Sequence, residues 1–399
     1  MSVQTRPPMD AYIVDVVRTP FGRGRESGSL AGMHPVDLLA SVLNGLVART
    51  GIDPAVVEDV ITGCVQQVGE QAGNIGRHAV LAAGWPDSVP AVTLDRKCGS
   101  FQQAVHFAAA TVASGQMDVV AVGGVEMMSL IPMKLNRMGR DELGPMFRAS
   151  RPDGLVGQGI SAELIAARYD LSREELDTLS AASHARAVAA RDGGVMSRDI
   201  LPVSTSHGVV SVDEGIRDST TAEGLAALKA SFQRDDFSER FPEIAWRITA
   251  GNSSQLTDGA AASLVVSGYA LKALNLTPRA RVVATSAVGD DPIMMLTGVI
   301  PATHRVLERA GLAIADMSTV EVNEAFASVV GAWLREFPIS DELVNPWGGA
   351  IAFGHPVGAS GGRLLANLIG CLEQTRGRYG LWTMCESGGM ANATILERV

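Results

Sequence analysis

Residues 347–362 read Trp-Gly-Gly-Ala-Ile-Ala-Phe-Gly-His-Pro-Val-Gly-Ala-Ser-Gly-Gly, so that one histidine, His355, stands among six glycines. Soon after, residues 383–389 read Thr-Met-Cys-Glu-Ser-Gly-Gly and contribute a thiol, Cys385. Glycine lets the backbone approach a reacting group closely and adopt torsions that other residues avoid, while imidazole and thiol exchange protons near neutral pH. This combination is typical of a reactive site.

The composition is that of a globular protein, since 46% of the 399 residues are hydrophobic and 19% are charged. The formal net charge is −10 and no run of Lys or Arg interrupts it, which argues against a nucleic-acid partner. Residues 1–10 lack the pattern of a signal peptide, and no apolar run approaches the roughly 20 residues of a membrane span. We therefore expect a cytoplasmic protein with no membrane partner.

The cysteines show neither paired metal-ligand spacing nor the density of a disulfide framework. We therefore expect no metal site, and at least one thiol that is free for chemistry. The four cysteines are Cys64, Cys98, Cys371 and Cys385.

Apolar and helical runs alternate along the chain, which predicts an α/β fold. The clearest strand candidates are 11–17, 118–122, 264–266 and 281–284, and the clearest helix is 35–49. Between about residues 129 and 257 strand signals become sparse, and a helical segment is expected over 162–192. We predict an N-terminal half, an inserted domain and a C-terminal half, made of residues 1–128 with 258–276, residues 129–257, and residues 277–399.

The two flanking halves repeat one order of strand, reactive residue, helix and strand. The members are 57–63, Cys98, a helical run to Ser114 and 118–122 in the first half, and 317–323, His355, 362–374 and 379–384 in the second. Each half thus presents a reactive residue at the start of a helix. We predict an internal duplication whose pseudo-symmetry brings Cys98 and His355 to one crevice.

Cys98 lies where a strand-like run gives way to a helix, in the segment Leu-Asp-Arg-Lys-Cys-Gly-Ser at residues 94–100. Unpaired N–H groups and the dipole at a helix N terminus stabilise a thiolate, so we expect a lowered pKa and a nucleophile. A buried structural cysteine is the competing interpretation, because free Cys is among the most buried residue types.

For His355 taken alone, a hydrogen-bonded core histidine is the competing interpretation. The segment Gly-Ala-Ser-Gly-Gly at residues 358–362 also matches the Gly-x-Ser-x-Gly elbow of serine hydrolases. That elbow follows a strand directly, whereas here His-Pro-Val precedes it, so Ser360 is not expected to be a nucleophile. A phosphate-binding P-loop is disfavoured, because its Lys-Ser or Lys-Thr pair is missing.

Several ordered blocks together resemble the thiolase family. They are Cys-Gly-Ser at 98–100, Gly-Gly-Val-Glu-Met-Met-Ser at 123–129, Asn-Glu-Ala-Phe-Ala at 323–327, the glycine-rich stretch 348–361, and Cys385 ahead of Gly388 and Gly389. The match runs in family order from Arg18 to Arg398. The resemblance implies an α/β thiolase fold: a duplicated five-layered αβαβα core with the insertion as a loop domain over the coenzyme A site.

The resemblance implies acyl transfer between a cysteine and coenzyme A. Cys98 would attack the 3-keto carbon of a 3-ketoacyl-CoA, His355 would activate that thiol, and Cys385 would serve as acid and base. Asn323, through a bound water, and His355 would form one oxyanion site. The backbone N–H groups of Cys98 and Ser387 would form the other.

The resemblance also implies CoA as a substrate, with no tightly bound cofactor. Arg217 would lie near the nucleotide, Phe232 would line the pantetheine tunnel, and Ser254 would contact the pantetheine. Phe326 would be a fourth contact with CoA. For Arg217 a solvated surface arginine is the alternative.

Three positions depart from the family pattern. Ser387 and Ala391 stand where many thiolases have glycine, and Gln158 stands where methionine is expected. Ser387 keeps a backbone N–H, but a positive φ at that position would introduce strain of about 1–3 kcal/mol. Gln158 is expected to alter the acyl pocket.

The sequence favours degradative thiolysis of a 3-ketoacyl-CoA to acetyl-CoA and a shortened acyl-CoA, catalysed by a homodimer or homotetramer. A biosynthetic acetoacetyl-CoA thiolase would use the same residues for Claisen condensation of acetyl-CoA. A β-ketoacyl synthase shares the fold, but its chemistry has no second catalytic thiol such as Cys385. A thiolase-like lipid carrier without turnover is supported only by Ser387.

Overall fold

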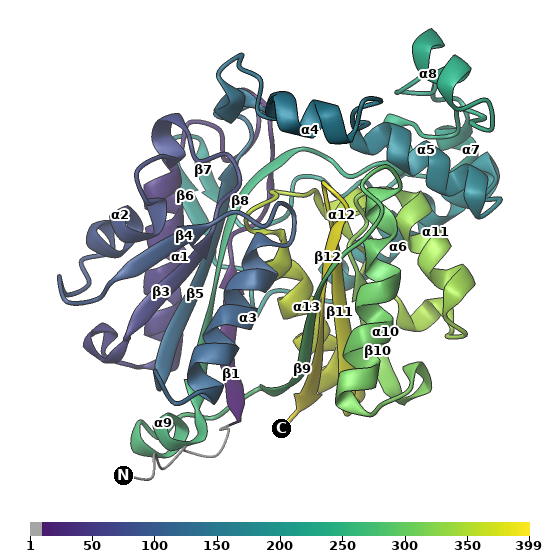
Figure 1. Cartoon of the computed structure of the whole chain (residues 1–399). Helices are drawn as coiled ribbons and strands as arrows, with labels where there is room; N and C mark the ends of the chain where they lie inside the picture. The colour runs from purple at the N-terminus through teal and green to yellow at the C-terminus, as the bar shows by residue number, and fades with distance from the viewer. Residues whose placement is uncertain (1–9) are drawn as a thin grey trace, which may run out of the picture.

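The computed structural model describes residues 10–399, and one large mixed sheet runs through it (Figure 1). Its strands are β1 (Ala11–Arg18), β2 (Gly22–Arg23), β3 (Asp59–Gly63), β4 (Ala91–Leu94), β5 (Val119–Met127), β8 (Thr257–Ser267), β9 (Ala280–Gly289), β10 (Met317–Val322), β11 (Tyr379–Glu386) and β12 (Met390–Arg398). A separate hairpin consists of β6 (Val203–Thr205) and β7 (Gly208–Val210).

The helices of the two halves are α1 (Pro35–Thr50), α2 (Ile75–Ala82), α3 (Ser100–Ala113), α9 (Gly268–Ala273), α10 (Val299–Ala310), α11 (Ala327–Glu336), α12 (Ala350–Phe353) and α13 (Ser360–Thr375). The helices between β5 and β8 are α4 (Gly144–Ser150), α5 (Gln158–Arg168), α6 (Arg173–Asp192), α7 (Ala222–Ala226) and α8 (Asp235–Arg240).

Five layers of helix and sheet follow one another across the molecule (Figure 1). Helices α1 and α2 cover the outer face of the strands β1, β8, β5, β3 and β4, and α10 covers the outer face of β9 to β12. Helices α3 and α13 lie between the two groups of strands and share a core with both. The predicted five-layered α/β architecture is confirmed.

The two halves have the same topology, as the predicted duplication requires. In the first half β3 and β5 are parallel, and β8 and then β1 continue the sheet antiparallel. In the second half β10 and β11 are parallel, and β12 and then β9 continue it antiparallel. Helix α3 precedes β5 just as α13 precedes β11, so Cys98 and His355 occupy corresponding places ahead of the two central helices.

Most of the strands and helices lie where the sequence pattern predicts them. All of β5 and β8 is buried, which explains their nearly continuous apolar sequence, because helices cover both faces of this part of the sheet. Helix α1 begins at the predicted Pro35, where proline suits the first helical position, and ends at Thr50, because the next residue, Gly51, has a φ of 70° that terminates the helix.

The inserted segment leaves and returns at one place, because Met127 at the end of β5 is paired with Asp258 near the start of β8. The single helical segment predicted over 162–192 is wrong. Two helices, α5 and α6, occupy this region, and Asp170 between them has a φ of 47°. Ser172 and Glu175 then form a capping box that starts α6.

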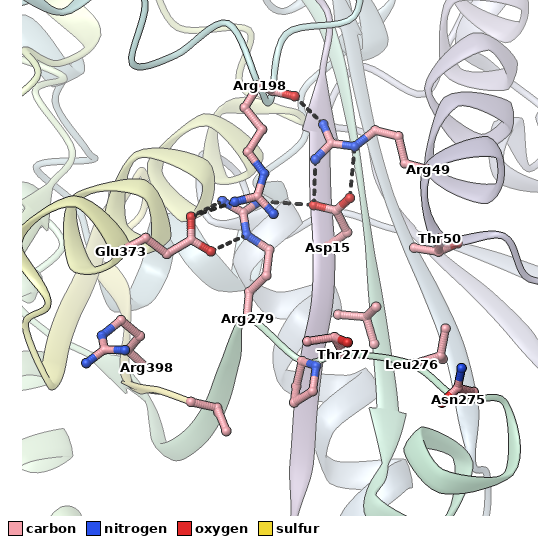
Figure 2. Close-up of a pocket in the computed structure, with 13 residues that line it drawn as sticks. Asp15, Arg49, Thr50, Arg198, Asn275, Leu276, Thr277, Arg279, Glu373 and Arg398 are labelled. Carbon is pink, nitrogen blue, oxygen red and sulfur yellow. Dashed lines mark hydrogen bonds and ion pairs between the residues drawn. The ribbon is translucent and has the colours of Figure 1, made fainter.

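A buried arginine connects three parts of the chain at the end of the sheet where the C terminus lies. Arg279 contacts Asp15 of β1 at 2.9 Å, Asp199 of the insertion at 2.8 Å and Glu373 of α13 at 2.8 Å. Figure 2 shows Arg279, Asp15 and Glu373 of this cluster beside a cavity of about 530 Å³. Arg49, which also lines the cavity, is paired with Asp15 at 2.9 Å. Arg49 and Arg279 are already paired with acidic residues of the protein. The cluster therefore connects the N-terminal half, the insertion and the C-terminal half.

Candidate active site

Three loops and the end of strand β11 bring the predicted catalytic residues to one end of the two central helices. Cys98 follows β4, Asn323 follows β10, Cys385 is the penultimate residue of β11, and His355 lies between α12 and α13. In the β11–β12 ladder Cys385 is paired with Ala391, whereas the cavity of Figure 2 lies at the opposite end of these strands, near Arg398. The catalytic residues are therefore remote from that cavity.

Cys98 precedes Gly99, the residue that caps the N terminus of α3, and it is only 5% exposed. Burial raises the pKa of its thiol, and the nearby Cys385 and Glu386 raise it further, while a hydrogen bond from the Gln158 side chain acts in the opposite direction. The predicted lowering of the Cys98 pKa is therefore wrong. The cost of desolvating a thiolate exceeds the benefit of the helix terminus, so the resting thiol needs a base.

His355 is buried and presents an unpartnered Nε2 atom. Its Nδ1 lies 2.5 Å from the hydroxyl oxygen of Ser360, and that hydroxyl donates its hydrogen to the carbonyl of Pro356 at 3.0 Å. Ser360 must then accept from Nδ1–H, which leaves the lone pair on Nε2. Burial, helped by the charge of Arg363, lowers the His355 pKa to about 3, so the resting imidazole is neutral and ready to accept a proton.

The loop that carries His355 is fastened to the N-terminal half by Glu126. One carboxylate oxygen accepts from the backbone N–H groups of Val65 at 2.9 Å and Gly358 at 3.1 Å. The other accepts from the side chain of Gln71 at 2.8 Å. A Cβ at Gly358 would lie 2.5 Å from the carbonyl of Val125, so only glycine allows this close approach.

Cys385 is fully buried, and the Asn323 amide donates to its sulfur at 3.8 Å. Burial raises the Cys385 pKa to about 12, although the hydrogen bond from Asn323 partly offsets this effect. The other amide atom of Asn323, Oδ1, is buried and has no hydrogen-bond partner. Asn323 is itself held by its backbone N–H, which donates to the carbonyl of Thr383 at 3.0 Å.

Glu324 anchors the Asn323 loop to the glycine-rich stretch. Its carboxylate accepts from the Ser183 hydroxyl at 2.6 Å, from the Asn345 amide at 2.9 Å and from the backbone N–H of Ile351 at 3.2 Å. A Cβ at Gly349 would meet this carboxyl group at 2.1 Å. The carboxyl group of Glu324 therefore requires glycine at position 349.

Ser387 and Ala391 fit the structure without backbone strain. Ser387 is not among the non-glycine residues of positive φ in the described chain, and the turn that follows it uses Gly388 and Gly389, whose φ values are 91° and 76°. Ala391 is fully buried in the core of the C-terminal half. The backbone of Ser387 therefore has none of the strain that a positive φ would introduce.

Three of the four residues predicted to contact CoA lie beside the catalytic loops. The rings of Phe232 and Phe326 meet edge to face, with centroids 6.0 Å apart. The backbone N–H of Ser254 donates to the carbonyl of Ala325 at 2.9 Å, and the next residue, Gln255, accepts from the backbone N–H of His355 at 2.9 Å.

The fourth residue, Arg217, has an exposed side chain that takes part in no ion pair within residues 10–399. Its backbone N–H donates to Nδ1 of the buried His184 at 3.2 Å. The guanidinium group is therefore free to meet an anionic group from solvent.

An open cavity of about 540 Å³ borders the turn after Cys385. It is lined by both apolar and charged groups, which come from the loop domain, from the loop after β9 and from this turn. They include Phe147, Arg151, Leu155, Asp290, Asp291 and Met390.

Sequence reasoning does not predict the contact of Ser360 with His355 or the anchoring roles of Glu126 and Glu324. A charged residue inside an otherwise apolar strand was the available signal for Glu126. Ser360 was noticeable only through a motif that belongs to a different chemistry.

Within residues 10–399, no group of three or more His, Cys, Asp and Glu side chains is arranged to hold a metal ion. In the same described part of the chain, no helix combines the length and apolar character needed to cross a membrane.

Two family models match the chain, the thiolase N-terminal domain over residues 11–268 and the thiolase C-terminal domain over residues 276–398. The steroid 3-ketoacyl-CoA thiolase FadA6 of Mycobacterium tuberculosis is 47% identical over 402 residues, which cover 98% of this chain and 94% of that protein. A 3-ketoacyl-CoA thiolase of Enterobacter sp. is 40% identical, covering 97% of this chain and 99% of the relative. The crystal structure of the Bacillus anthracis acetyl-CoA acetyltransferase matches with a TM-score of 0.87 and 34% identity, covering 98% of this chain and 100% of that one. The chain belongs to the thiolase family.

Proposed function

We propose that this protein is an acyltransferase that cleaves a 3-ketoacyl-CoA with CoA, giving acetyl-CoA and a shortened acyl-CoA through an acyl group on Cys98. The observation that carries the proposal is a pair of neighbouring buried thiols, Cys98 and Cys385, at the same end of the central helices as a neutral imidazole whose Nε2 is unpartnered. The relatives named as 3-ketoacyl-CoA thiolases support the degradative direction.

In the first half-reaction the Cys98 thiol gives its proton to Nε2 of His355, and the sulfur attacks the 3-keto carbon. The backbone N–H groups of Cys98 and Ser387 stabilise the oxyanion, each such donor being worth about 3 kcal/mol. The bond between C2 and C3 then breaks. The thioester oxygen of the departing enolate is stabilised by His355 and by a water bound to Asn323, and Cys385 protonates C2 to release acetyl-CoA.

In the second half-reaction the Cys385 thiolate removes the proton from the thiol of an incoming CoA. The CoA sulfur attacks the acyl carbon on Cys98, and the Cys98 sulfur leaves and recovers its proton from His355. Both thiols end as they began, so the sequence of steps balances. The raised pKa of Cys385, about 12, suits a group that must protonate a carbanion.

The pantetheine of CoA lies along Phe232, Phe326 and Ser254, and Arg217 meets a phosphate of the nucleotide. Phe232, Arg217 and Ser254 belong to the inserted residues 129–257, so this loop domain covers the CoA channel. CoA is a substrate, and the reaction uses no tightly bound cofactor.

The acyl portion of the substrate occupies the cavity beside the turn at Gly388 and Gly389. Its volume of about 540 Å³ has room for an acyl group larger than acetyl, and Phe147, Leu155 and Met390 contribute apolar contact. The steroid 3-ketoacyl-CoA thiolase among the relatives gives independent support for a large acyl group.

Steady-state thiolysis across 3-ketoacyl-CoA substrates of increasing acyl size tests the proposal. We expect kcat/KM to rise beyond the C4 substrate. Activity confined to acetoacetyl-CoA would instead identify a biosynthetic acetoacetyl-CoA thiolase, the activity suggested by the acetyltransferase neighbour. Absence of any turnover, with CoA still bound, would identify a carrier.

We also propose a homodimer or homotetramer that works in the cytoplasm. Strand β4 is the terminal strand of the sheet and exposes Val92, and an unpaired edge of this kind can join the edge of a second copy. Sedimentation analysis distinguishes the two assemblies from a monomer.

A further inference from the structure

Glu386 is a buried carboxyl group that the reaction steps above do not use. It is the last residue of β11, immediately after Cys385, and its side chain is 0% exposed. Both carboxyl oxygens are buried, and neither has a hydrogen-bond partner within the described residues. An unpartnered carboxylate is costly to bury, so this environment favours the neutral acid.

The carboxyl group lies against the loop that carries the nucleophile. A Cβ built on Gly99, the residue after Cys98, would meet Oε1 of Glu386 at 1.9 Å. The same strand end places the group next to Cys385, although successive side chains of β11 point to opposite faces of the sheet. Glu386 therefore lies against the loop of Cys98 and directly follows Cys385 in the chain.

The charged groups around Glu386 do not supply a cationic partner at contact distance. On the loop before α3, Arg96 directs Nη1 at the sulfur of Met390, 3.9 Å away, and Asp95 is paired with Lys97 at 2.6 Å. Burial raises the Glu386 pKa to about 8; Arg96 opposes this shift and Asp95 adds to it. The charge of an ionised Glu386 raises the pKa of Cys98 and of Cys385.

We propose that Glu386 is a positioning residue for the two thiols: it stays protonated while the enzyme works, and its ionisation suppresses thiolate formation at Cys98 and sets the alkaline limit of acyl transfer. The proposal rests on the proposed role of Cys98 as nucleophile. The carboxyl group acts through the sulfur atoms and touches no reacting carbon.

The test is the rate at which iodoacetamide alkylates Cys98, measured by peptide mass spectrometry at pH 6.5 and pH 9 in the wild type and in Glu386→Gln. Alkylation follows the thiolate fraction and needs no turnover, so a failure of the proposed thiolysis leaves this readout intact. Glu342→Gln, which removes an exposed carboxylate, is the matched control for net charge.

We expect Glu386→Gln and the wild type to react within about twofold at pH 6.5, where the wild-type carboxyl is protonated. At pH 9 the variant should react about threefold faster or more, the effect of half a pKa unit on the thiolate fraction. The Glu342→Gln control should follow the wild type at both pH values. A ratio between Glu386→Gln and wild type that is the same at both pH values would overturn the proposal.

A second measurement covers the case in which Glu386→Gln does not fold. Difference infrared spectra of the wild type between pH 6.5 and pH 9 should lose a C=O stretching band of a protonated carboxyl, with a midpoint near pH 8. Glu321, also buried with a pKa raised to about 8, contributes a similar band, so Glu321→Gln is recorded in parallel. If no protonated-carboxyl band remains in Glu321→Gln at pH 6.5, the proposal is wrong.

Discussion

At the scale of single residues, the site keeps its reacting groups uncharged until substrate arrives. Burial raises the pKa of Cys98 and of Cys385 and lowers that of His355, so the resting site holds two protonated thiols and a neutral imidazole. A resting site of this kind avoids burying isolated charges. In the reaction that we propose, the direction of the His355 lone pair decides whether the first proton transfer occurs.

Ser360→Ala removes the hydroxyl group that accepts from Nδ1 of His355. We expect kcat to fall roughly 10- to 100-fold because the imidazole loses its fixed orientation and tautomer. KM should stay within about twofold, since Ser360 is fully buried and its hydroxyl group is bonded to His355 and Pro356. Steady-state kinetics measures both constants. An unchanged kcat would show that Ser360 does not orient the base.

The Cys385→Ala variant distinguishes the role of Cys385 from that of Cys98. The variant should still form an acyl adduct on Cys98 with a reactive acyl donor, but thiolysis should fall by at least about 100-fold, because no other described group can exchange the proton at C2. Rapid-quench acylation and steady-state thiolysis measure the two steps. Full thiolysis in this variant would refute the acid and base role of Cys385.

At the scale of elements, carboxylates in the core hold the catalytic loops in place. Glu126 of β5 connects the His355 loop to the loop after β3, and Glu324 connects the Asn323 loop to the glycine-rich stretch. Each of these contacts crosses from one half or one loop to another. The geometry of the site therefore depends on residues that need not touch the substrate.

Glu126→Ala leaves buried donors without an acceptor, each at a cost of about 1–3 kcal/mol. We expect a lower melting temperature together with a roughly 100-fold lower kcat for the enzyme that remains folded. Glu126→Gln keeps an oxygen between Val65 and Gly358 and should retain more of both properties. If Glu126→Ala loses stability and keeps full kcat, the carboxylate does not position the His355 loop.

The elements were predictable wherever local sequence decides them. Periodicity and the proline and glycine signals predict α1, and continuous apolar runs predict β5 and β8. The sequence pattern does not predict the break between α5 and α6. Asp170 has a left-handed conformation there, and neither a glycine nor a proline marks the position in the sequence. The pKa of Cys98 was misjudged because burial depends on the packing of distant segments, which the helix N terminus does not reveal.

At the scale of the whole molecule, one buried ionic cluster joins both halves to the insertion. Arg279→Ala leaves Asp15, Asp199 and Glu373 without their shared partner, and breaking such a buried cluster costs about 3–5 kcal/mol. Thermal unfolding should show a large fall in melting temperature. Kinetics of the folded variant should change little, because the cluster lies at the opposite end of the sheet from Cys385.

Arg281→Ala is the matched control for this prediction. Arg281 pairs with Asp10 at 3.1 Å and Glu397 at 2.6 Å, but its side chain is 32% exposed, so its loss should cost at most about 1 kcal/mol. Equal destabilisation by the two substitutions would mean that the cluster around Arg279 has no special role in joining the parts.

The duplication was also predictable at this scale, because Cys98 and His355 occupy corresponding places in two repeated patterns of strand and helix. The sequence does not reveal which residues of the two halves touch, as the unexpected roles of Glu126 and Ser360 illustrate. Such contacts form only when the two groups of strands in the large sheet pack on α3 and α13.

The most direct test of the account is the identity of the residue that carries the acyl group. The protein is mixed with a 3-ketoacyl-CoA without added CoA, quenched, digested and examined by peptide mass spectrometry. We predict that the shortened acyl group is found on Cys98 in the wild type, that Cys385→Ala forms little of this adduct because it cannot protonate C2, and that Cys98→Ala has neither adduct nor turnover. An adduct on another residue, or turnover retained in Cys98→Ala, would contradict the account.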